Sequence, residues 1–346
     1  MAYTTIDKPD LYFNTVLYTG NGSTQSITGV GFAGDFFWFK ERSVAGNNQI
    51  LDRVRSSFTK NLITNTTDSE GTTSTYITSV NSDGFDLGVN NAINQSGVTN
   101  VAWSWLADNT TGSSNNDGSI TSTVSANTTS GFSIVSYTGT GSAGTVGHGL
   151  GTTPAMIIVK NRDAVTNWIV GHKSLGLSNG VILLNSNSAS TTDSTVWNNT
   201  SPTSSVFSVG ANGGSYGTTT TSNNFIAYCF AEKKGFSKFG SFSGNANADG
   251  TFVYTGFKPA FIIEKLSSGL ASWLMFDNKR DGINGSNNYL YTNETNSEST
   301  TQLIDILSNG FKHRHAGGAN ASGTSIYMAF AENPLVGTNN IPATAR

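Results

Sequence analysis

Three stretches of the chain have the same form, an apolar run that ends in lysine: Phe36-Phe37-Trp38-Phe39-Lys40, Met156-Ile157-Ile158-Val159-Lys160 and Phe261-Ile262-Ile263-Glu264-Lys265. The three lysines are 120 and 105 residues apart along the chain. This interval is too long for a solenoid unit and is about the size of a small domain. The sequence therefore predicts one kind of domain used three times.

Further landmarks recur in the same order around each of these runs. Each copy has an aromatic residue near its start, a turn followed by a strand, and a closing apolar strand. The matching segments are Tyr18-Thr19-Gly20, Tyr137-Thr138-Gly139 and Phe242-Ser243-Gly244; then Asp83-Gly84-Phe85, Ser205-Val206-Phe207 and Asn309-Gly310-Phe311; then the strands that carry Trp105, Phe230 and Phe330. Because these last three aromatic residues align on one strand, we expect them to be core residues.

The local pattern is that of an all-β protein. Residues 131–137 and 251–257 alternate between apolar and polar side chains, and turn pairs such as Asp249-Gly250 separate such segments. Helical periodicity is nearly absent. Each copy therefore predicts eight to ten antiparallel strands that pack as a two-sheet sandwich, of the jelly-roll or lectin-like kind.

The repeats and the composition together predict six segments. We expect an N-terminal anchor peptide at 1–11, sandwiches at 12–107, 131–234 and 236–334, a linker rich in Ser, Thr, Asn and Gly at 108–130, and a C-terminal tail at 335–346. An anchor that extends to residue 16, or one at the C-terminal tail instead, is compatible with the same pattern. Repeats two and three follow each other almost without a spacer, which predicts a fixed mutual orientation.

Composition argues against several classes of function. Charged residues make up only 12% of the chain and the net charge is −3, so there is no basic surface for nucleic acid. No apolar run is long enough to span a membrane. The first residues lack the basic and apolar regions of a signal peptide, which predicts synthesis in the cytoplasm without secretion.

Motifs for catalysis are weak. Residues 139–144 match a dinucleotide fingerprint, but the glycine-rich continuation cannot form the helix that this site needs, so a hairpin loop is the better interpretation. Cys229, the single cysteine, lies in an apolar strand and predicts a small buried side chain. Six acidic residues lie in loop-like surroundings and predict solvated carboxylates rather than a catalytic pair: Asp52, Asp68, Glu70, Asp277, Glu294 and Glu298. We predict no enzymatic activity and no cofactor.

Histidine offers one weak metal hypothesis. His313 and His315 are two residues apart, so in an extended strand both would lie on one face. On the axis of a trimer, three such pairs would supply six nitrogen ligands to a transition metal. The alternative, an exposed polar strand end, is the better interpretation. The oxygen-rich segment 247–250 is an equally weak calcium candidate.

Aromatic side chains are the remaining candidates for ligand binding, because exposed tryptophans stack on sugar rings. Trp168 and Trp273 match each other in repeats two and three and follow loop-like segments. Trp197 has no equivalent in the other repeats and is flanked by polar residues. We therefore take Trp197 first, and Trp168 and Trp273 next, as candidate ligand-facing aromatics, with core packing as the alternative.

Several motifs resemble those of one protein family. They are Met1-Ala2-Tyr3-Thr4-Thr5-Ile6-Asp7-Lys8-Pro9, Val146-Gly147-His148-Gly149-Leu150-Gly151, Tyr228-Cys229-Phe230-Ala231-Glu232, Gly256-Phe257-Lys258-Pro259-Ala260-Phe261 and Tyr327-Met328-Ala329-Phe330-Ala331-Glu332-Asn333-Pro334. With them, essentially the whole chain is similar to tandem-repeat proteins of tailed bacteriophages, especially marine ones. The resemblance supplies no catalytic or binding residues, and the pair at 313 and 315 departs from the family's pattern.

The resemblance implies a virion protein with a lectin-like sandwich in each repeat. We expect a non-enzymatic tail fibre, spike or head-surface decoration that contacts other tail or capsid proteins and host surface polysaccharide. A homotrimer is the favoured assembly, from the habit of phage fibres. The alternatives are a polysaccharide-degrading tailspike enzyme, which the lack of a parallel β-helix repeat disfavours, and a bacterial surface lectin, which the missing signal peptide disfavours.

Overall fold

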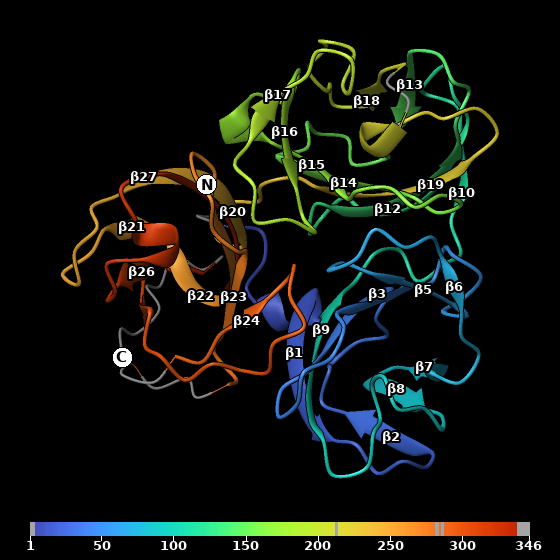
Figure 1. Cartoon of the computed structure of the whole chain (residues 1–346). Coiled ribbons are helices and arrows are strands. Elements are labelled where there is room, and N and C mark those ends of the chain that lie inside the picture. The colour runs from blue at the N-terminus through green and yellow to red at the C-terminus, as the bar shows by residue number, and fades with distance from the viewer. Residues whose placement is uncertain (1–3, 212–213, 281–283, 285–286, 338–346) are drawn as a thin grey trace.

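The computed structural model describes residues 4–337 except 212–213, 281–283 and 285–286. The described chain is all-β, as predicted, apart from four short 3-10 turns, and it forms three lobes around a common centre (Figure 1). The lobes correspond to the three repeats and contain nine, ten and eight named strands in this part of the chain. Each lobe pairs a large antiparallel sheet with a small one, which confirms the predicted sandwich architecture.

Repeat 1 begins with the strand that follows the short turn η1 (Pro9–Leu11). Its large sheet has the order β1-β9-β3-β4-β5-β6 and its small sheet the order β2-β8-β7. Their bounds are β1 (Phe13–Thr19), β2 (Gln25–Thr28), β3 (Phe36–Glu41), β4 (Gln49–Asp52), β5 (Lys60–Ile63), β6 (Gly71–Thr72), β7 (Ile77–Asn81), β8 (Gly84–Leu87) and β9 (Thr99–Trp105). Every residue of β3 is buried, as its unbroken apolar run requires.

Repeat 2 repeats this order and adds two strands at one edge, giving β10-β11-β12-β19-β14-β15-β16-β17 beside the small pair β13-β18. The bounds are β10 (Ser113–Asn115), β11 (Ser122–Asn127), β12 (Phe132–Thr138), β13 (Gly144–Gly147), β14 (Met156–Asn161), β15 (Ile169–His172), β16 (Gly180–Leu183), β17 (Thr191–Thr192), β18 (Val206–Val209) and β19 (Asn224–Phe230); the turns η2 (Lys173–Leu175) and η3 (Gly214–Tyr216) lie between them.

The prediction of a linker at 108–130 is wrong in structural terms. This segment carries β10 and β11, and β11 pairs with β12 over six residues from Ser122 to Asn127. Val124 and Ile120 from the same segment are buried in the core of repeat 2. A low-complexity composition concealed the strand because serine and threonine tolerate the pleated conformation when a few apolar residues supply a buried face.

Repeat 3 has the large sheet β20-β27-β22-β23-β24 and the small sheet β21-β26-β25. The bounds are β20 (Ser237–Gly244), β21 (Phe252–Tyr254), β22 (Phe257–Leu266), β23 (Leu274–Asp277), β24 (Leu290–Tyr291), β25 (Ile304–Leu307), β26 (Gly310–His313) and β27 (Gly323–Pro334), with the turn η4 (Gly318–Asn320) before the last strand. Lys258, Pro259 and Phe261 mark register irregularities between β22 and β27. Proline is tolerated there because the ladder is already interrupted.

Each sandwich encloses a core of its own, and a fourth core joins all three. The fourth core lies between the large sheets, which face one another at the centre of Figure 1. At its middle the rings of Trp105, Phe230 and Phe330 form a triangle with centroid separations of 6.4, 6.1 and 5.6 Å. These are the three residues that the sequence aligned and predicted as core. Their burial confirms that prediction, and the triangle brings one equivalent residue of each repeat together.

The described part of the N-terminal segment belongs to this body and does not project from it. Ile6 is buried in the shared core, and the Thr4 hydroxyl donates to the carbonyl of Lys234 at 2.8 Å. Tyr12 meets Phe236 edge to face. Residues 4–11 therefore do not form a free extended peptide; the anchoring role at 1–11 stays a prediction, and residues 1–3 lie outside the described chain. Of the predicted tail at 335–346, only 335–337 are described.

Candidate functional site

The junctions between repeats contain several buried polar and charged side chains. At each junction the lysine that ends an apolar run reaches into a loop of the preceding repeat. The contacts are Lys40 Nζ to the carbonyl of Thr295 at 3.1 Å, Lys160 Nζ to that of Thr67 at 3.2 Å, and Lys265 Nζ to that of Asn187 at 3.3 Å. Repeat 1 thus contacts repeat 3, repeat 2 contacts repeat 1, and repeat 3 contacts repeat 2, so the contacts form a closed ring.

These lysines are structural donors. Each ammonium also donates to carbonyls of its own loop, for example Lys265 Nζ to Leu266 O at 2.6 Å. Burial lowers the pKa of Lys40, Lys160 and Lys265 to about 8, because the charged form loses hydration. The Nζ atoms of these lysines donate to backbone carbonyls, so the lysines hold the loops at the junctions in place.

A second ring of contacts uses the predicted tryptophans. Trp168 Nε1 donates to Ile63 O and Trp273 Nε1 to Leu183 O, both at 2.8 Å, across successive junctions. At the third junction Asn48 takes the equivalent place, and its Nδ2 donates to Tyr291 O at 2.9 Å. Both tryptophans lie in the shared core and are at most 1% exposed. Trp168 and Trp273 therefore offer no surface for a sugar, and that prediction is wrong.

Trp197 is also buried, although polar residues flank it in the sequence. It lies in the core of repeat 2 with 2% of its surface exposed, and its Nε1 donates to Gly180 O at 3.1 Å. The polar neighbours Asn198 and Asn199 adopt positive φ, so the chain turns sharply after the ring. The prediction of a ligand-facing Trp197 is wrong because a tight turn, not an exposed loop, accounts for the polar flank.

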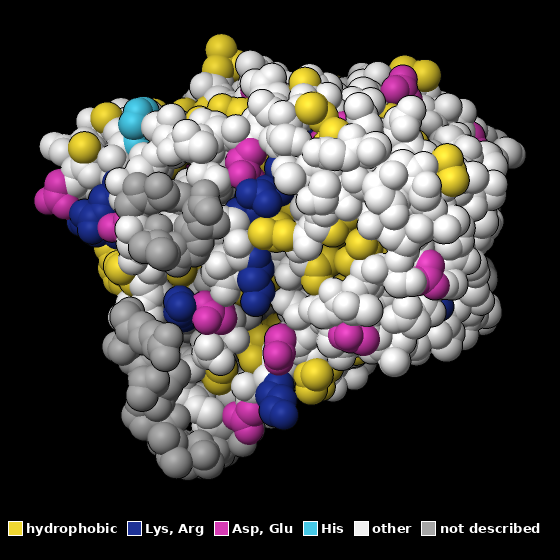
Figure 2. Space-filling model, turned by 90° about the horizontal axis from the view of Figure 1, so that it is seen from below, with side chains coloured by type: hydrophobic (Ala, Val, Ile, Leu, Met, Phe, Trp, Pro, Cys, Tyr) yellow, Lys and Arg dark blue, Asp and Glu magenta, His cyan; other side chains and the backbone are white. Residues whose placement is uncertain are grey.

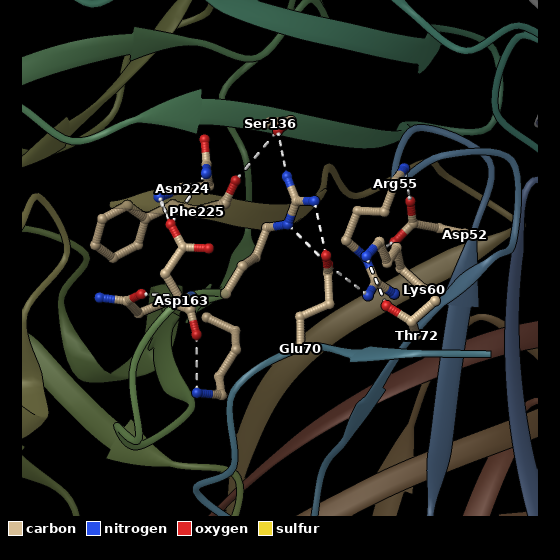
Figure 3. A network of polar contacts seen from close by, with 12 residues as sticks. Asp52, Arg55, Lys60, Glu70, Thr72, Ser136, Asp163, Asn224 and Phe225 are labelled. Atoms are coloured by element: carbon tan, nitrogen blue, oxygen red, sulfur yellow. Dashed lines mark hydrogen bonds and ion pairs between the residues drawn. The ribbon is translucent and has the colours of Figure 1, made fainter. Parts of the chain in front are cut away.

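The junction of repeats 1 and 2 contains a buried ion network (Figure 3). Asp52 binds Arg55 Nε at 2.5 Å, and Arg55 Nη1 lies 3.2 Å from Glu70. Glu70 in turn accepts both Nε and Nη2 of Arg162 from repeat 2, at 2.8 and 2.9 Å. The hydroxyl of Tyr228, also from repeat 2, donates to Asp52 at 2.7 Å. The two arginines hold the pKa of Glu70 below its ordinary value despite burial.

The junction of repeats 3 and 1 repeats this network with equivalent residues. Asp277 binds Arg280 at 2.6 Å, Arg280 lies 3.1 Å from Glu298, and Glu298 accepts two bonds of 2.8 Å from Arg42 of repeat 1. Trp103 takes the role of the tyrosine and donates to Asp277 at 3.0 Å. A buried charge is tolerated only when paired and hydrogen-bonded, and both networks meet that condition.

At the third junction, between repeats 2 and 3, the position of Asp52 and Asp277 is occupied by His172, so no ion pair forms at this position. His172 pairs with Met156 as Asp52 pairs with Phe36 and Asp277 with Phe261. Its Nδ1 accepts the N–H of Ser174, so Nε2 carries the proton and donates to the carbonyl of Tyr327 at 3.1 Å. Burial lowers the pKa of His172 to about 4, which keeps the ring neutral at this junction.

The prediction of solvated carboxylates is wrong for four of the six acidic residues. Asp52 and Asp277 are fully buried, and Glu70 and Glu298 have side chains about 10% exposed or less. Each of these four carboxylates forms an ion pair with an arginine, so none is placed as a free general base. Asp68 is exposed in a loop, as predicted, and Glu294 is half-buried in a loop.

His313 and His315 diverge instead of sharing a face. β26 ends at His313, which is buried beside Phe242 with ring centroids 4.8 Å apart, whereas His315 is exposed and its Nδ1 accepts Gly317 N–H. His313 Nε2 lies 3.4 Å from the buried carboxyl of Glu264, and neither group makes a hydrogen bond there to the described residues. The paired metal ligands predicted on one face are therefore not formed, and no group of three or more His, Cys, Asp or Glu in the described chain could hold a metal ion.

This buried pair predicts a pH effect on stability. Burial raises the pKa of Glu264 from 4.5 to about 8 and lowers that of His313 from 6.5 to about 4. Between pH 4.5 and 6.5 the two effects oppose each other. From pH 6.5 to 8 Glu264 alone of this pair acts: the folded chain keeps a proton that the unfolded chain has lost, so the contribution of Glu264 to stability falls by up to about 1.4 kcal/mol per pH unit. As the pH approaches 8, the buried Lys40, Lys160 and Lys265 act in the opposite direction, because their pKa values are lowered in the folded chain. The effect of Glu264 is therefore the difference between the pH profiles of the native chain and of a variant without this carboxyl.

Replacing Glu264 by glutamine is expected to remove this fall, because the amide does not titrate. Urea unfolding curves at pH 6.5, 7, 7.5 and 8 measure it for the native chain and for E264Q. Parallel pH profiles of the two proteins would show that the carboxyl is already ionised in the folded chain.

The structure also locates the other residues that the sequence suggested as candidates for chemistry. Cys229 is buried, as predicted, and burial raises the pKa of its thiol. Residues 139–143 connect β12 to β13, which begins at Gly144, so a strand and not a helix follows this glycine-rich segment. In the segment 247–250, Asp249 pairs with Lys312 at 2.9 Å.

The outer surface is mostly uncharged. Figure 2 shows scattered Lys, Arg, Asp and Glu side chains on a face dominated by other residues. Where repeat 1 meets repeat 3, an open groove of about 410 Å³ is lined by polar side chains that include Lys8, Asp10, Asn14, Lys279 and Asn333. No helix within the described ranges has the length and apolar character needed to cross a bilayer.

Comparison with protein families gives one match, and it spans all three repeats. The model of the family described as domain of unknown function DUF7483 matches residues 8–334. The chain belongs to the DUF7483 family. No curated protein and no solved structure matches it. The DUF7483 match begins just before β1 and ends with β27, so it covers the closed ring as a unit.

The sequence of this DUF7483 chain carries a signal for the junction networks. Asp52 and Asp277 lie at equivalent positions of repeats 1 and 3, and His172 lies at that position of repeat 2. Each aspartate is followed three residues later by an arginine, Arg55 or Arg280. In a chain so poor in charge, matching acidic and basic residues at equivalent positions of two repeats indicate paired groups.

Proposed function

We propose that this chain is a non-enzymatic structural protein of a tailed-phage particle, exposed at its surface as a fibre, spike or head decoration, and that it contacts host glycans. The resemblance of its motifs to phage tandem-repeat proteins suggests the setting. The observation that carries the proposal is the aromatic triangle of Trp105, Phe230 and Phe330. It ties three sandwiches into one rigid body, as a particle component that must survive outside a cell requires.

Two further features support a structural role. The buried carboxylates, arginines and lysines of the junctions hold repeats together, so the charged groups that could serve chemistry are used for assembly. The outer surface is rich in hydroxyl and amide groups, which suits contact with sugars, and multiple copies on a particle would add weak contacts into firm attachment. Homotrimer assembly is part of the proposal and predicts a solution mass of three times 36.4 kDa.

Gold-labelled antibody against the chain, imaged on intact particles of the phage that encodes it, tests the setting. Label at the tail or its tip supports an adhesion fibre, and label over the head supports a decoration protein. Particles without label would contradict the proposal. In parallel, purified protein incubated with host capsular polysaccharide should leave the polymer length unchanged; progressive shortening would show a depolymerising enzyme instead.

A further inference from the structure

A pocket of about 360 Å³ opens in repeat 3 beside β24 and has the size of a small-ligand site. Its wall is formed by the strand itself, by the loop that precedes β23, and by the segment after β26. Its lining includes Leu270, Ser272, Tyr289, Tyr291, Glu294 and His315. Leu270 is 77% exposed and stands at the rim.

Two tyrosines give the pocket an aromatic wall. Tyr291 ends β24 and Tyr289 lies just before it; both are half-buried, with ring centroids 5.4 Å apart and planes at 89°. Tyr289 rests in turn on Phe276 of the sandwich core at 6.0 Å, so the wall is held from behind. Rings fixed in this way lose little freedom when a ligand packs against them.

Polar groups around this wall suit hydroxyl recognition. Glu294 accepts hydrogen bonds from Ser272 and from Asn296, which orient its carboxylate and leave lone pairs for a ligand. His315 accepts Gly317 N–H at Nδ1, so Nε2 is the ring donor. The Tyr291 hydroxyl donates to the Tyr289 hydroxyl at 3.4 Å, and burial together with this contact raises the pKa of Tyr291.

The aromatic pair occurs at these positions in repeat 3 and not at the equivalent described positions of repeats 1 and 2. Pairing places Tyr291 opposite Leu274, as Leu183 of repeat 2 lies opposite Ile169 and Ile63 of repeat 1 opposite Gln49. Two positions earlier, Tyr289 corresponds to Val181 and Asn61. The aromatic pair therefore replaces side chains that the same fold accepts elsewhere, so core packing did not require it.

We propose that this pocket binds a single neutral pyranose unit of a polysaccharide. The aromatic wall packs against the apolar C–H face of the ring, and the Glu294 carboxylate and the His315 Nε2–H bond its hydroxyls. No lysine or arginine is among the described residues that line the pocket, and Glu294 brings negative charge, so an acidic sugar is disfavoured. The inference rests on the proposed function, since it names the glycan class that such a surface protein contacts.

Saturation-transfer NMR on the full chain tests it, with the methyl pyranosides of glucose, galactose and mannose and with methyl glucuronide as the acidic probe. We expect at least one neutral glycoside to receive saturation with millimolar affinity, and the glucuronide to receive less. The absence of transfer to every neutral glycoside, or preference for the glucuronide, would overturn the proposal.

Variants locate the binding. Y289V/Y291L installs the residues of repeat 2 and is expected to weaken binding about tenfold or more, a loss of about 1.4 kcal/mol. E294Q keeps the shape of the side chain and is expected to weaken glycoside binding without affecting folding. It therefore tests the site even if the double variant misfolds. Y254L, at an exposed tyrosine outside the pocket, is the matched control. Equal binding by E294Q, or by a folded Y289V/Y291L, and the native chain would refute the site.

These outcomes separate this inference from the proposed function. Glycoside binding is measured on purified protein, whereas the position on the particle is measured with labelled antibody. Label on the particle without binding in the pocket would overturn only the sugar site. Binding in the pocket without label would overturn only the virion setting.

Discussion

Replacement of Arg55 by alanine is expected to lower the free energy of unfolding by about 3–5 kcal/mol, the loss that follows when one partner of a buried ion pair is removed. The guanidinium is fully buried between Asp52 and Glu70, and it also donates to the carbonyl of Ile50 at 3.1 Å. Without it the Asp52 carboxylate stays buried with no cation, held only by neutral donors such as Tyr228. Urea unfolding measures the loss.

The chain provides matched controls for this prediction. Arg280 occupies the equivalent place in repeat 3, so R280A should cost as much as R55A. Lys258 and Glu332 form a surface pair with side chains about one-third exposed, so K258A should cost less than about 1 kcal/mol. If R55A and K258A destabilised the chain equally, the junction network would not be stabilising the ring.

Replacement of Trp105 by alanine is expected to cost about 3–5 kcal/mol and to weaken all three repeats together. Its ring contacts Phe13 of its own repeat at 4.6 Å, Phe230 of repeat 2 at 6.4 Å, and Phe261 and Phe330 of repeat 3 at 5.5 and 5.6 Å. The cavity would therefore open where the three large sheets meet.

Hydrogen exchange followed by mass spectrometry resolves this effect. In W105A, peptides from β9, β19 and β27 should lose protection by similar amounts, because each of these strands carries one ring of the triangle. F252A, at a side chain 42% exposed, is the control and should leave protection unchanged. Loss confined to β9 would mean that the repeats are coupled weakly.

The sequence was sufficient for the repeats and for the sandwich architecture. Strand and turn patterns are local, and the matching positions of Lys40, Lys160 and Lys265 fixed the alignment of the repeats. The aligned aromatics Trp105 and Phe230 were correctly expected in a core. Which core they fill was not predictable, because alternation indicates that a face is buried and not what covers it.

One signal for the shared core was present. β3 is apolar at every position from Phe36 to Phe39, so both faces of its sheet must be covered. A free-standing sandwich would have needed a polar outer face there. The burial of Trp168 and Trp273 follows from the same cause, since each indole N–H donates to a carbonyl of the neighbouring repeat.

The candidate sugar site in repeat 3 could not be predicted from the sequence. Tyr289 and Tyr291 look like ordinary strand residues, and Glu294 and His315 are distant from each other along the chain. Only the folded chain brings the segment after β26 and the residues around β24 to one pocket. Side chains from several separate segments converge there, and no local sequence pattern predicts such a convergence.

Differential scanning calorimetry of the full chain tests the central claim most directly, namely that three repeats form one body through a shared core. The account predicts a single transition whose calorimetric enthalpy equals the van't Hoff enthalpy, because no large sheet keeps its inner face covered once its neighbours unfold. Resolved transitions, or a calorimetric enthalpy about three times the van't Hoff value, would show sandwiches that fold independently and would contradict it.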